Sequence, residues 1–370
     1  MQAKPKIRFT NKNRSQFFGI LKTRVDNFFT ENNLNKTANS EMVVKTITLI
    51  AAYFIPFICV LVFQLNNLQL LAAYSLMGIA MAGIGMCVMH DANHNAYSSN
   101  GKINKYLGYS LNLIGGMVYN WKLQHNVLHH TYTNIHGMDD DIANKSILRF
   151  SPHSPPKKIH KFQFIYVFFF YTILTIYWAL LKDFVQLKRY KENGVSRANK
   201  KEYFNNLVKT IISKVLYIGV FIVVPIVVFG YSFWQIFGFF MVMHAIAGLV
   251  LGVVFQMAHS VIETSYPIPN EKGEIENDWA IHQLNTTMNF ARGNKLLSWY
   301  VGGLNFQVEH HLFPNICHVH YTKIAPIVKQ TCKEYGIPYL DSPTFFEALK
   351  SHVKMLKKFG YEFNLDLATM

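Results

Sequence analysis

Charge is what this sequence has little of. Only 15% of its 370 residues are charged, against roughly 25% in an average soluble domain, and 51% are apolar. Acidic residues are the scarcer sign, 21 against 36 lysines and arginines, so the formal net charge is +15. The basic residues lie beside apolar segments, which is typical of a membrane surface. No nucleic-acid-binding motif accompanies them, so we expect no nucleic-acid partner.

Cysteine is also scarce. The chain has four cysteines and no C-x-x-C pair: Cys59 and Cys87 lie inside apolar stretches, and Cys317 and Cys332 are isolated. This spacing indicates neither a disulfide framework nor a thiolate zinc site. The N-terminus is basic but lacks the adjoining apolar core of a signal peptide.

Two long stretches contain no charged residue at all. They are residues 46–89 and 215–262. Each is long enough for two membrane-spanning helices of roughly 20 residues. Asn66-Asn67 interrupts the first stretch and Gly230-Tyr231-Ser232 the second, so each is predicted to form a hairpin.

A third apolar stretch, residues 163–181, has basic residues on both sides. If it crossed the membrane, one basic cluster would lie outside, against the positive-inside tendency. A fifth crossing would also separate the histidine motifs described below onto opposite sides. We therefore expect an interfacial or re-entrant helix, or a brace embedded in the membrane.

These patterns predict an all-α integral membrane protein. It has four transmembrane helices in two hairpins plus the interfacial or re-entrant helix, capped by a cytosolic helical domain that holds a di-metal site. We expect both termini and the active site on the cytoplasmic side. Three regions are predicted: a basic cytosolic segment at 1–42, the membrane hairpins with two histidine motifs at 43–264, and a cytosolic part with a third motif at 265–370.

Histidine is what the chain has in excess. Eight of its sixteen histidines form three motifs and one outlier: HDANH at 90–94, HNVLHH at 125–130, QVEHH at 307–311, and His259 at the end of the last predicted span. On an α-helix, residues i and i+4 share a face, so His125 and His129 are expected to share one centre. His130 is turned by roughly 100°, towards a second ion. The predicted metal ligands are His90, His94, His125, His129, His130, His259, His310 and His311.

Eight imidazoles suit two divalent ions of iron, zinc, copper or nickel. The lack of thiolates argues against structural zinc, and no H-E-x-x-H peptidase motif is present. Carboxylates beside the motifs are expected to accept imidazole N–H bonds and offset the positive charge. These are Asp91, Asp139, Asp140, Asp141 and Glu309. The isolated histidines are expected to be structural: His136, His153, His160, His244 and His352.

The three motifs resemble the histidine boxes of the integral-membrane fatty acid desaturases. Their order, their separation and the intervening hairpin match that family over about residues 40 to 320. The resemblance implies a centre of two non-haem iron ions on the cytosolic face, with His259 as an additional ligand. It also implies O2 as co-substrate and a fatty acyl substrate carried on CoA or on a membrane lipid. Two hydrogens would leave neighbouring methylenes, and O2 would leave as water with two external electrons.

Gln307 stands where the third box of many such enzymes begins with histidine. This form, in NFQVEHHLFP, resembles the front-end desaturases, which insert a double bond between an existing one and the carboxyl end. Gln307 would then be a weak or outer-shell ligand, or none. Many front-end enzymes carry a fused b5-type cytochrome with an H-P-G-G motif, which this sequence lacks. We therefore expect a separate electron donor, a ferredoxin or a b5-type cytochrome with its reductase.

Other readings stay open on the residues alone. A lipid or carotenoid hydroxylase, epoxygenase or ketolase of the same superfamily would use the same boxes. A membrane metal transporter is more distant, because transporters bind near the bilayer midplane and only His244 lies mid-span here. No catalytic group beyond the metal ligands and no individual substrate-binding residue is predicted. His282 is favoured as structural, and Arg292, Lys295 and Lys122 are either phosphate contacts or solvated charges.

Overall fold

The computed structural model describes residues 7–10, 16–143, 146–276 and 278–362, and they form two compact units. The first unit contains residues 39–123 and 168–253. The second contains the described residues of 7–38, 124–167 and 254–362. The chain therefore enters each unit more than once, and three helices run from one unit into the other. These are the π-helix η2 (Lys122–His129), α9 (Gln163–Thr172) and α14 (Phe233–His259).

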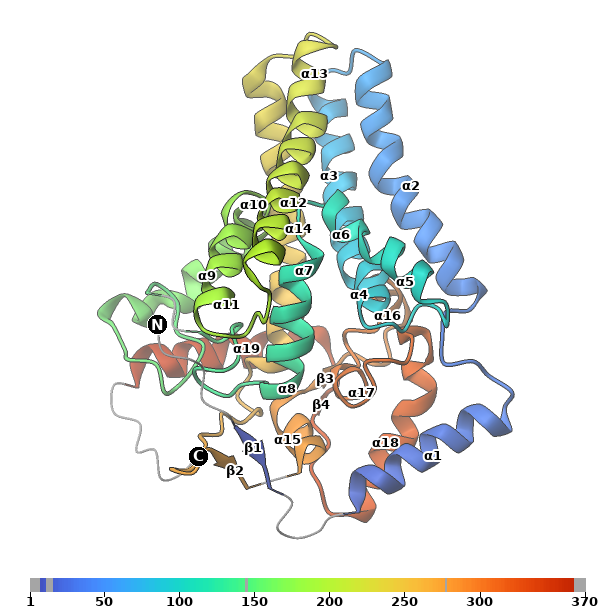
Figure 1. The fold of residues 1–370 in the computed structure, drawn as a ribbon, viewed down its shortest axis with the longest axis vertical. Helices are drawn as coiled ribbons and strands as arrows, with labels where there is room; N and C mark the ends of the chain where they lie inside the picture. The colour runs from blue at the N-terminus through green and yellow to red at the C-terminus, as the bar shows by residue number, and fades with distance from the viewer. Residues whose placement is uncertain (1–6, 11–15, 144–145, 277, 363–370) are drawn as a thin grey trace. The chain divides into compact units, whose positions relative to one another are not determined.

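The first unit consists of helices alone among its described residues (Figure 1). Its N-terminal part holds α2 (Ser40–Val62), α3 (Asn67–Gly83), the π-helix η1 (Ile84–Val88), α4 (Met89–Asn93), α5 (Gly101–Gly108), α6 (Ser110–Leu113) and α7 (Val118–Trp121). The remainder holds α10 (Leu174–Tyr177), the π-helix η4 (Trp178–Lys182), α11 (Asp183–Glu192), α12 (Lys200–Ile218), the π-helix η5 (Gly219–Val223) and α13 (Val224–Val227).

The second unit combines helices with four two-residue strands. Its elements are β1 (Arg8–Phe9), α1 (Phe17–Glu31), α8 (His130–Tyr132), the 3-10 helix η3 (Lys158–Phe162), β2 (Glu274–Ile275), α15 (Trp279–Thr286), β3 (Asn289–Phe290), α16 (Lys295–Tyr300), α17 (Gln307–Leu312), the 3-10 helix η6 (His318–His320), α18 (Tyr321–Glu334), β4 (Asp341–Ser342) and α19 (Phe345–Tyr361).

Four described helices are long and apolar enough to cross a membrane, as the uncharged stretches predicted. They cover residues 40–62, 67–93, 200–227 and 233–259. The third begins fifteen residues before the uncharged stretch at 215, because its first turns are polar and amphipathic. Asn199 starts it with a capping box, accepting from the Glu202 N–H while the Glu202 carboxylate accepts from the Asn199 N–H.

Both predicted hairpin turns are present, and side chains tie them together. Asn66 caps α3 through a reciprocal pair of bonds with Gln69. Tyr231, from the other turn, donates its hydroxyl to the Phe63 carbonyl at 2.8 Å and accepts from the Leu65 N–H at 2.9 Å. A single tyrosine therefore satisfies backbone groups left unpaired at the end of α2.

The third apolar stretch is not a straight helix. Lys158–Thr172 and Leu174–Glu192 meet at an angle of 56°, the geometry of a broken span or a re-entrant loop. The bend lies against α14 at two glycines. A Cβ on Gly248 would collide with the Tyr171 carbonyl oxygen, and one on Gly252 would lie 2.8 Å from the Tyr171 ring. This small-residue pair allows the close backbone approach that is common between membrane helices.

Two polar side chains inside the first unit, Lys214 and His244, are held by hydrogen bonds. The Lys214 ammonium of α12 donates to the Asp183 carboxylate and to the Gly115 and Trp178 carbonyls. His244, the mid-span histidine, has both ring nitrogens bonded, at 3.0 Å to Thr175 and at 3.0 Å to Tyr217. The expectation that His244 is structural agrees with this pairing, because no ring nitrogen is left for a ligand.

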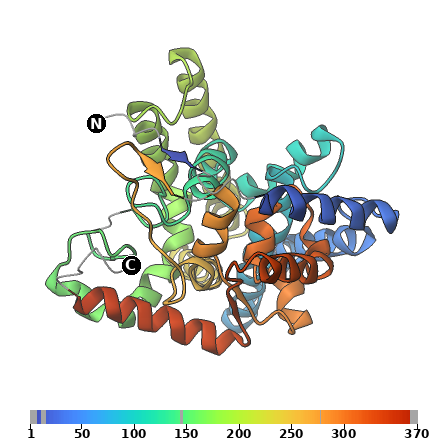
Figure 2. The ribbon, with the colours of Figure 1, turned by 90° about the horizontal axis from the view of Figure 1, so that it is seen from below.

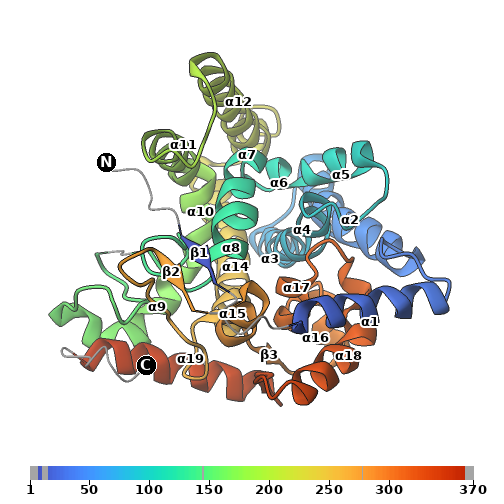
Figure 3. The same cartoon turned by 60° about the horizontal axis from the view of Figure 1, so that its bottom comes forward.

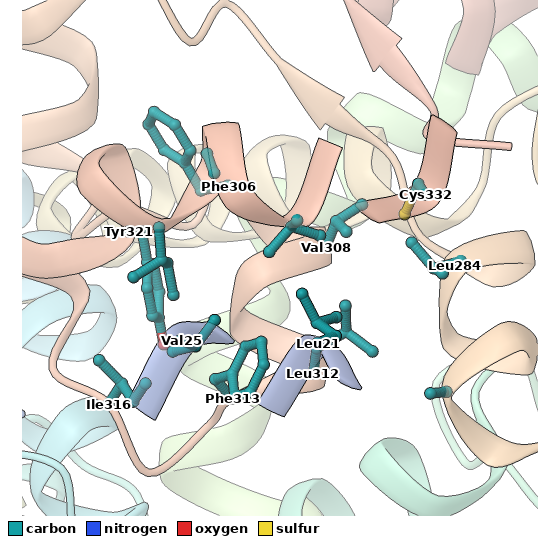
Figure 4. Packing of buried hydrophobic residues seen from close by; sticks show 14 of the residues in the cluster. Leu21, Val25, Leu284, Phe306, Val308, Leu312, Phe313, Ile316, Tyr321 and Cys332 are labelled. Carbon is teal, nitrogen blue, oxygen red and sulfur yellow. The ribbon is translucent and has the colours of Figure 1, made fainter. Parts of the chain in front are cut away.

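The core of the second unit packs α1 onto α17 and α18. Phe17, Leu21, Val25 and Phe29 recur every four residues and form the buried face of α1. Figure 3 shows α1 beside α18, and Figure 4 shows Leu21 and Val25 pointing towards Leu312 and Phe313 at the end of α17. The third histidine motif therefore lies on a helix whose apolar residues anchor it in this core. Besides the residues of α1, the core contains Leu284, Phe306, Val308, Leu312, Phe313, Ile316, Tyr321 and Cys332.

Short parallel strand pairs fix the remaining segments of this unit. β1 pairs with β2, placing Arg8 opposite Glu274, and β3 pairs with β4, placing Asn289 opposite Asp341. The C-terminal helix α19 follows β4, and Figure 2 shows its last turns beside the segment that contains η3. Gly360 permits this contact, because a Cβ there would collide with the His160 carbonyl oxygen.

Candidate metal centre

The second histidine motif does not lie on an ordinary α-helix. Residues 122–129 form a π-helix, whose hydrogen bonds run from i to i+5. The expectation that His125 and His129 share one centre assumed α-helical spacing, and it does not describe this segment. The wider turn instead brings together residues five apart: the Nε2 atoms of His125 and His130 lie 3.2 Å from each other. His129 is directed to different neighbours.

Those neighbours form a buried triad of imidazoles. His129, His259 and His311 each offer one ring nitrogen, and the three atoms lie within 4.8 Å of one another. All three side chains are buried. The Nε2 atoms of all three have no hydrogen-bond partner among the described residues. A buried polar atom without a partner is costly, so three that converge on one point fit a metal ion.

The opposite nitrogen of each ring is held by the protein. His129 Nδ1 lies 3.1 Å from Asp139 and 3.4 Å from Asp141. His259 Nδ1 lies 3.2 Å from the Thr286 carbonyl oxygen, and His311 Nδ1 lies 2.7 Å from Gln283 Oε1. Because each Nδ1 faces an oxygen acceptor, it carries the proton and leaves Nε2 with its lone pair. This is the usual outer arrangement of metal-binding histidines.

A second group lies next to the triad. His130, His310 and His311 also offer ring nitrogens within 4.8 Å of one another, and all three are buried. His125 joins them through its contact with His130 and a stacked ring at 5.9 Å from His310. His310 Nδ1 lies 3.2 Å from the Tyr321 hydroxyl. The structure therefore brings six of the eight predicted ligands together within the second unit.

The remaining two predicted ligands, His90 and His94, lie in the first unit. The helix 67–93 continues past the uncharged stretch, so His90 sits in its last turns and His94 directly after it. Their rings are 4.7 Å apart, and each meets the edge of Trp121, at 5.7 and 5.6 Å. The i, i+4 spacing thus pairs these two imidazoles as predicted. Their assignment to the same centre as the other six stays a prediction from the sequence.

The predicted carboxylates have different surroundings. Asp139 and Asp141 both face His129. Asp91 is buried beside His90, with 4.0 Å between Oδ1 and Nδ1, and Asp140 is half-buried. Glu309 is buried, but its carboxylate accepts from the Tyr339 hydroxyl at 2.8 Å and the Asn289 amide at 2.9 Å. The Glu309 bonds therefore hold α17 to β3 and to the segment before β4.

The groups around His129 shift one another's pKa values. Burial opposes a charge on this imidazole, but Asp139 and then Asp141 raise the pKa of His129 above its usual value. Burial would raise the pKa of Asp139, yet His129 and two backbone N–H groups lower it. Burial and the surrounding imidazoles lower the pKa of His311 well below its usual value. The centre therefore offers an ion the neutral imidazole of His311 and the imidazole of His129, which is bonded to carboxylates.

Gln307 is buried at the start of α17, with no hydrogen-bond partner for its Oε1 among the described residues. Its place in the ligand set stays a prediction. Arg292, considered as a phosphate contact, is instead paired with both carboxylate oxygens of Asp341. His282 bonds to the Thr133 backbone and meets the Phe9 ring at 5.0 Å. Burial lowers the pKa of His282 to about 4.

Several supporting residues were not found by sequence reasoning. Gln283 accepts from His311 and from the Thr133 hydroxyl, at 2.7 and 3.0 Å, and so connects the third motif to the segment that follows the second. Trp279 donates its indole N–H to the His130 carbonyl at 3.1 Å. Asn289 and Tyr339 hold Glu309. For Gln283 and Asn289 the signal in the sequence was the polar stretch HQLNTTMNF, which is unusual in so apolar a chain, whereas Trp279 and Tyr339 lie outside it.

The profile of the fatty acid desaturase family matches residues 65–343, most of the chain. The chain belongs to the fatty acid desaturase family. It is therefore an acyl desaturase, an oxidoreductase, and the resemblance seen in the three histidine boxes is confirmed. Desaturases of this family generally use two iron ions and O2, and the buried imidazole groups are suited to metal.

Curated relatives match over nearly the whole chain. An sn-1 linoleoyl-lipid 6-desaturase of Synechocystis is 36% identical over 96% of this chain and 98% of its own length. An enzyme of the same name from Arthrospira platensis is 35% identical over 91% of each chain. An acyl-lipid (8-3)-desaturase of Physcomitrium patens is 32% identical over 98% of this chain and 76% of its own length.

Proposed function

We propose that this desaturase is of the front-end type and acts on an acyl chain carried by a membrane lipid. The relatives' names, which describe lipid-linked acyl substrates and positions near the carboxyl end, support this. Gln307 in the third box supports it independently, on the family's sequence pattern.

We further propose that two iron ions are bound by the predicted histidines. The observation that carries this is the convergence of three unpartnered Nε2 atoms, with each Nδ1 held by an oxygen. One ion would be bound by the triad around His129, and the other by the group around His130. His90 and His94 are assigned as further ligands from their motif. Asp91, Asp139, Asp140, Asp141, Glu309 and Gln307 are proposed as weak or outer-shell groups.

Bound iron would supply the activation of O2 that no side chain provides. In the overall reaction, two C–H bonds on neighbouring methylenes are lost and one C=C bond forms. O2 takes up these two hydrogens with two further electrons and two protons, and leaves as two waters. The chain's own residues orient the ligands: Asp139, Gln283 and the Thr286 carbonyl fix which ring nitrogen of each histidine faces inward.

The two electrons are proposed to come from a separate protein, a ferredoxin or a b5-type cytochrome with its reductase. We place the histidine boxes and both termini on the cytoplasmic side. The basic flanks of the apolar segments and the uncharged turns at 66–68 and 230–232 support this orientation.

Product analysis tests the function. The gene is expressed in a host whose lipids contain defined unsaturated chains, and the double bonds of each lipid class are mapped by mass spectrometry. We expect a loss of two hydrogens between an existing double bond and the carboxyl end. A gain of one oxygen would instead support the hydroxylase or ketolase alternative, and a new bond on the methyl side would contradict the front-end assignment.

A ligand variant tests the metal assignment. His129→Ala should abolish desaturation and lower the iron bound per chain, with the protein still in the membrane. His136→Ala is the matched control, because His136 lies in the same unit but outside both groups. Full activity of His129→Ala, or a purified protein that contains only zinc, would overturn the proposed oxidative centre.

A further inference from the structure

The C-terminal helix α19 presents one face to its surroundings, and that face is basic and aromatic. Phe346, Lys350, Lys354, Lys357 and Tyr361 recur every three or four residues, so they lie along a single stripe. All five are exposed, and the aromatic residues at the two ends, Phe346 and Tyr361, are 77% and 50% exposed. Only one acidic residue, Glu347, lies in the helix.

The opposite face of α19 is anchored in the second unit. Its buried residues are Ala348, Ser351, His352, Met355, Leu356, Phe359 and Gly360. The helix is therefore not a loose tail, and the orientation of its basic stripe is fixed. Because the protein covers the apolar face, only the basic and aromatic stripe is available to a partner.

The middle of α19 is bonded to the point where the last apolar span ends. That span ends at His259. His352 Nδ1 lies 2.6 Å from the Ser260 carbonyl oxygen, and the Ile262 N–H donates to the Ser351 hydroxyl at 3.1 Å. The helix is thus attached within three residues of the end of a membrane-spanning segment.

The C-terminal end of α19 is bonded to the start of another apolar segment. Gln163, the first residue of α9, donates to the Leu356 carbonyl at 2.8 Å. The buried Arg149 guanidinium donates to the Phe359 and Glu362 carbonyls and so caps the helix. These contacts join α19 to the ends of two apolar segments.

The neighbouring η3 has the same character. Ile159 and Phe162 are 49% and 58% exposed, and lysines 157, 158 and 161 surround them. The Lys357 ammonium lies 5.8 Å from the centre of the Phe164 ring. Exposed apolar side chains interleaved with lysines are expected where headgroups meet acyl chains, since lysine extends its ammonium to the polar layer.

We propose that this surface, the outward stripe of α19 with η3, binds the headgroups of anionic phospholipids. The lysines supply the charge, and Phe346 and Tyr361 insert at the interface as the aromatic belts of membrane proteins do. An acidic partner protein would also meet the lysines, but aromatic residues at both ends and two attachments to apolar segments favour lipid. The proposal does not depend on the assignment of the metal ligands.

Depth measurement tests the placement. A nitroxide is attached at Tyr361→Cys in full-length protein reconstituted in nanodiscs, with Cys59, the one half-buried native cysteine, replaced by alanine. A nitroxide at Lys333→Cys on α18 is the water-facing control. We expect the label at 361 to collide more with O2 and less with a water-soluble nickel complex than the control. Equal collision profiles at the two positions would overturn the placement.

Lipid retention tests the chemistry. The variant K350Q/K354Q/K357Q is compared with K22Q/K323Q/K333Q, which removes three exposed lysines from α1 and α18. Native mass spectrometry counts the phosphatidylglycerol molecules retained by each. We expect the α19 variant alone to bind phosphatidylglycerol at least about tenfold more weakly, because each lysine near an anionic headgroup adds attraction. If the α19 variant retained phosphatidylglycerol unchanged but was reduced more slowly by its protein electron donor, the stripe would be the donor's binding surface and the proposal would be overturned.

Discussion

His129 is the residue with the most specific surroundings in the candidate centre. Its Nδ1 faces two carboxylates, Asp139 and Asp141, while its Nε2 is buried beside His259 and His311 without a bonding partner. Two carboxylates on one imidazole make it a more basic ligand than its neighbours. The remaining rings in the triad face uncharged oxygens, so the protein places its strongest donor at one defined position.

Gln283 should affect metal binding, although it contacts no metal in our proposal. Gln283→Ala removes the acceptor of His311 Nδ1 and the link to Thr133, so the ring loses its fixed orientation. We expect about a 10- to 100-fold loss in activity or metal affinity, the usual effect of removing such a partner. Iron content after equilibrium dialysis measures it. Gln283→Glu keeps the acceptor oxygen and should recover most of the bound iron; equal losses in both variants would contradict the role.

His352 predicts a pH dependence of stability. Burial lowers its pKa to about 4, below the usual 6.5. Between those values the unfolded chain binds a proton that the folded chain does not, so stability is full above pH 6.5 and falls as the pH drops. From pH 6.5 to 5 the loss is about 2 kcal/mol, at about 1.4 kcal/mol per unit. We expect His352→Asn, which keeps a donor for the Ser260 carbonyl, to lose less stability than the unaltered protein in thermal unfolding at pH 5.

At this scale the sequence indicated the candidate ligands more clearly than the residues that hold them. The number and spacing of the histidines marked them as candidates, and Asp139 and Asp141 were indicated by their proximity to the second motif. Gln283, Asn289 and Tyr339 carry no such signal, since a glutamine, an asparagine or a tyrosine is ordinary anywhere in a chain. Their roles depend on contacts between segments 20 to 150 residues apart, which periodicity cannot reveal.

Among the elements, the π-helix at 122–129 changes the chemistry most. It separates His129 from His130 and pairs His130 with His125, so three imidazoles within six residues serve two groups. A spacing of four or five residues in a sequence is assigned by default to an α-helix, and nothing in KLQHNVLH contradicts that default. The hairpins, in contrast, were predictable because an absence of charge over 40 residues has few alternatives in water.

The contact between α14 and the bent segment predicts a helix-packing variant. Gly248→Val should destabilise the protein, because its side chain meets the Tyr171 and Thr172 backbone, which cannot move as a side chain can. Overpacking of this kind costs about 1–3 kcal/mol. Gly238→Val is the matched control on the same helix, since nothing lies within 4 Å of a Cβ there. Thermal unfolding in detergent should separate the two variants, and equal midpoints would contradict the packing argument.

For the whole molecule, metal and fold should be linked. Six of the proposed ligands come from η2, α8, α14 and α17, which together extend from residue 122 to residue 312, and His90 and His94 come from α4 and the residue after it. An ion that binds the folded chain alone stabilises it by mass action. We expect about two iron atoms per purified chain on the family's pattern, and a lower unfolding temperature after chelation. Adding iron back should restore the unfolding temperature. If the unfolding temperature were the same before and after iron removal, the imidazole groups would not be metal sites.

His311 has a further consequence. It belongs to both groups of three, yet its Nδ1 is held by Gln283, so only one lone pair remains to be donated. A neutral imidazole nitrogen satisfies one ion at a time. Whichever ion takes it leaves the other with a weaker hold from this unit. The two positions should then differ in metal affinity. A gradual chelator titration should remove the metal in two steps, with an intermediate state in which the chain holds a single ion.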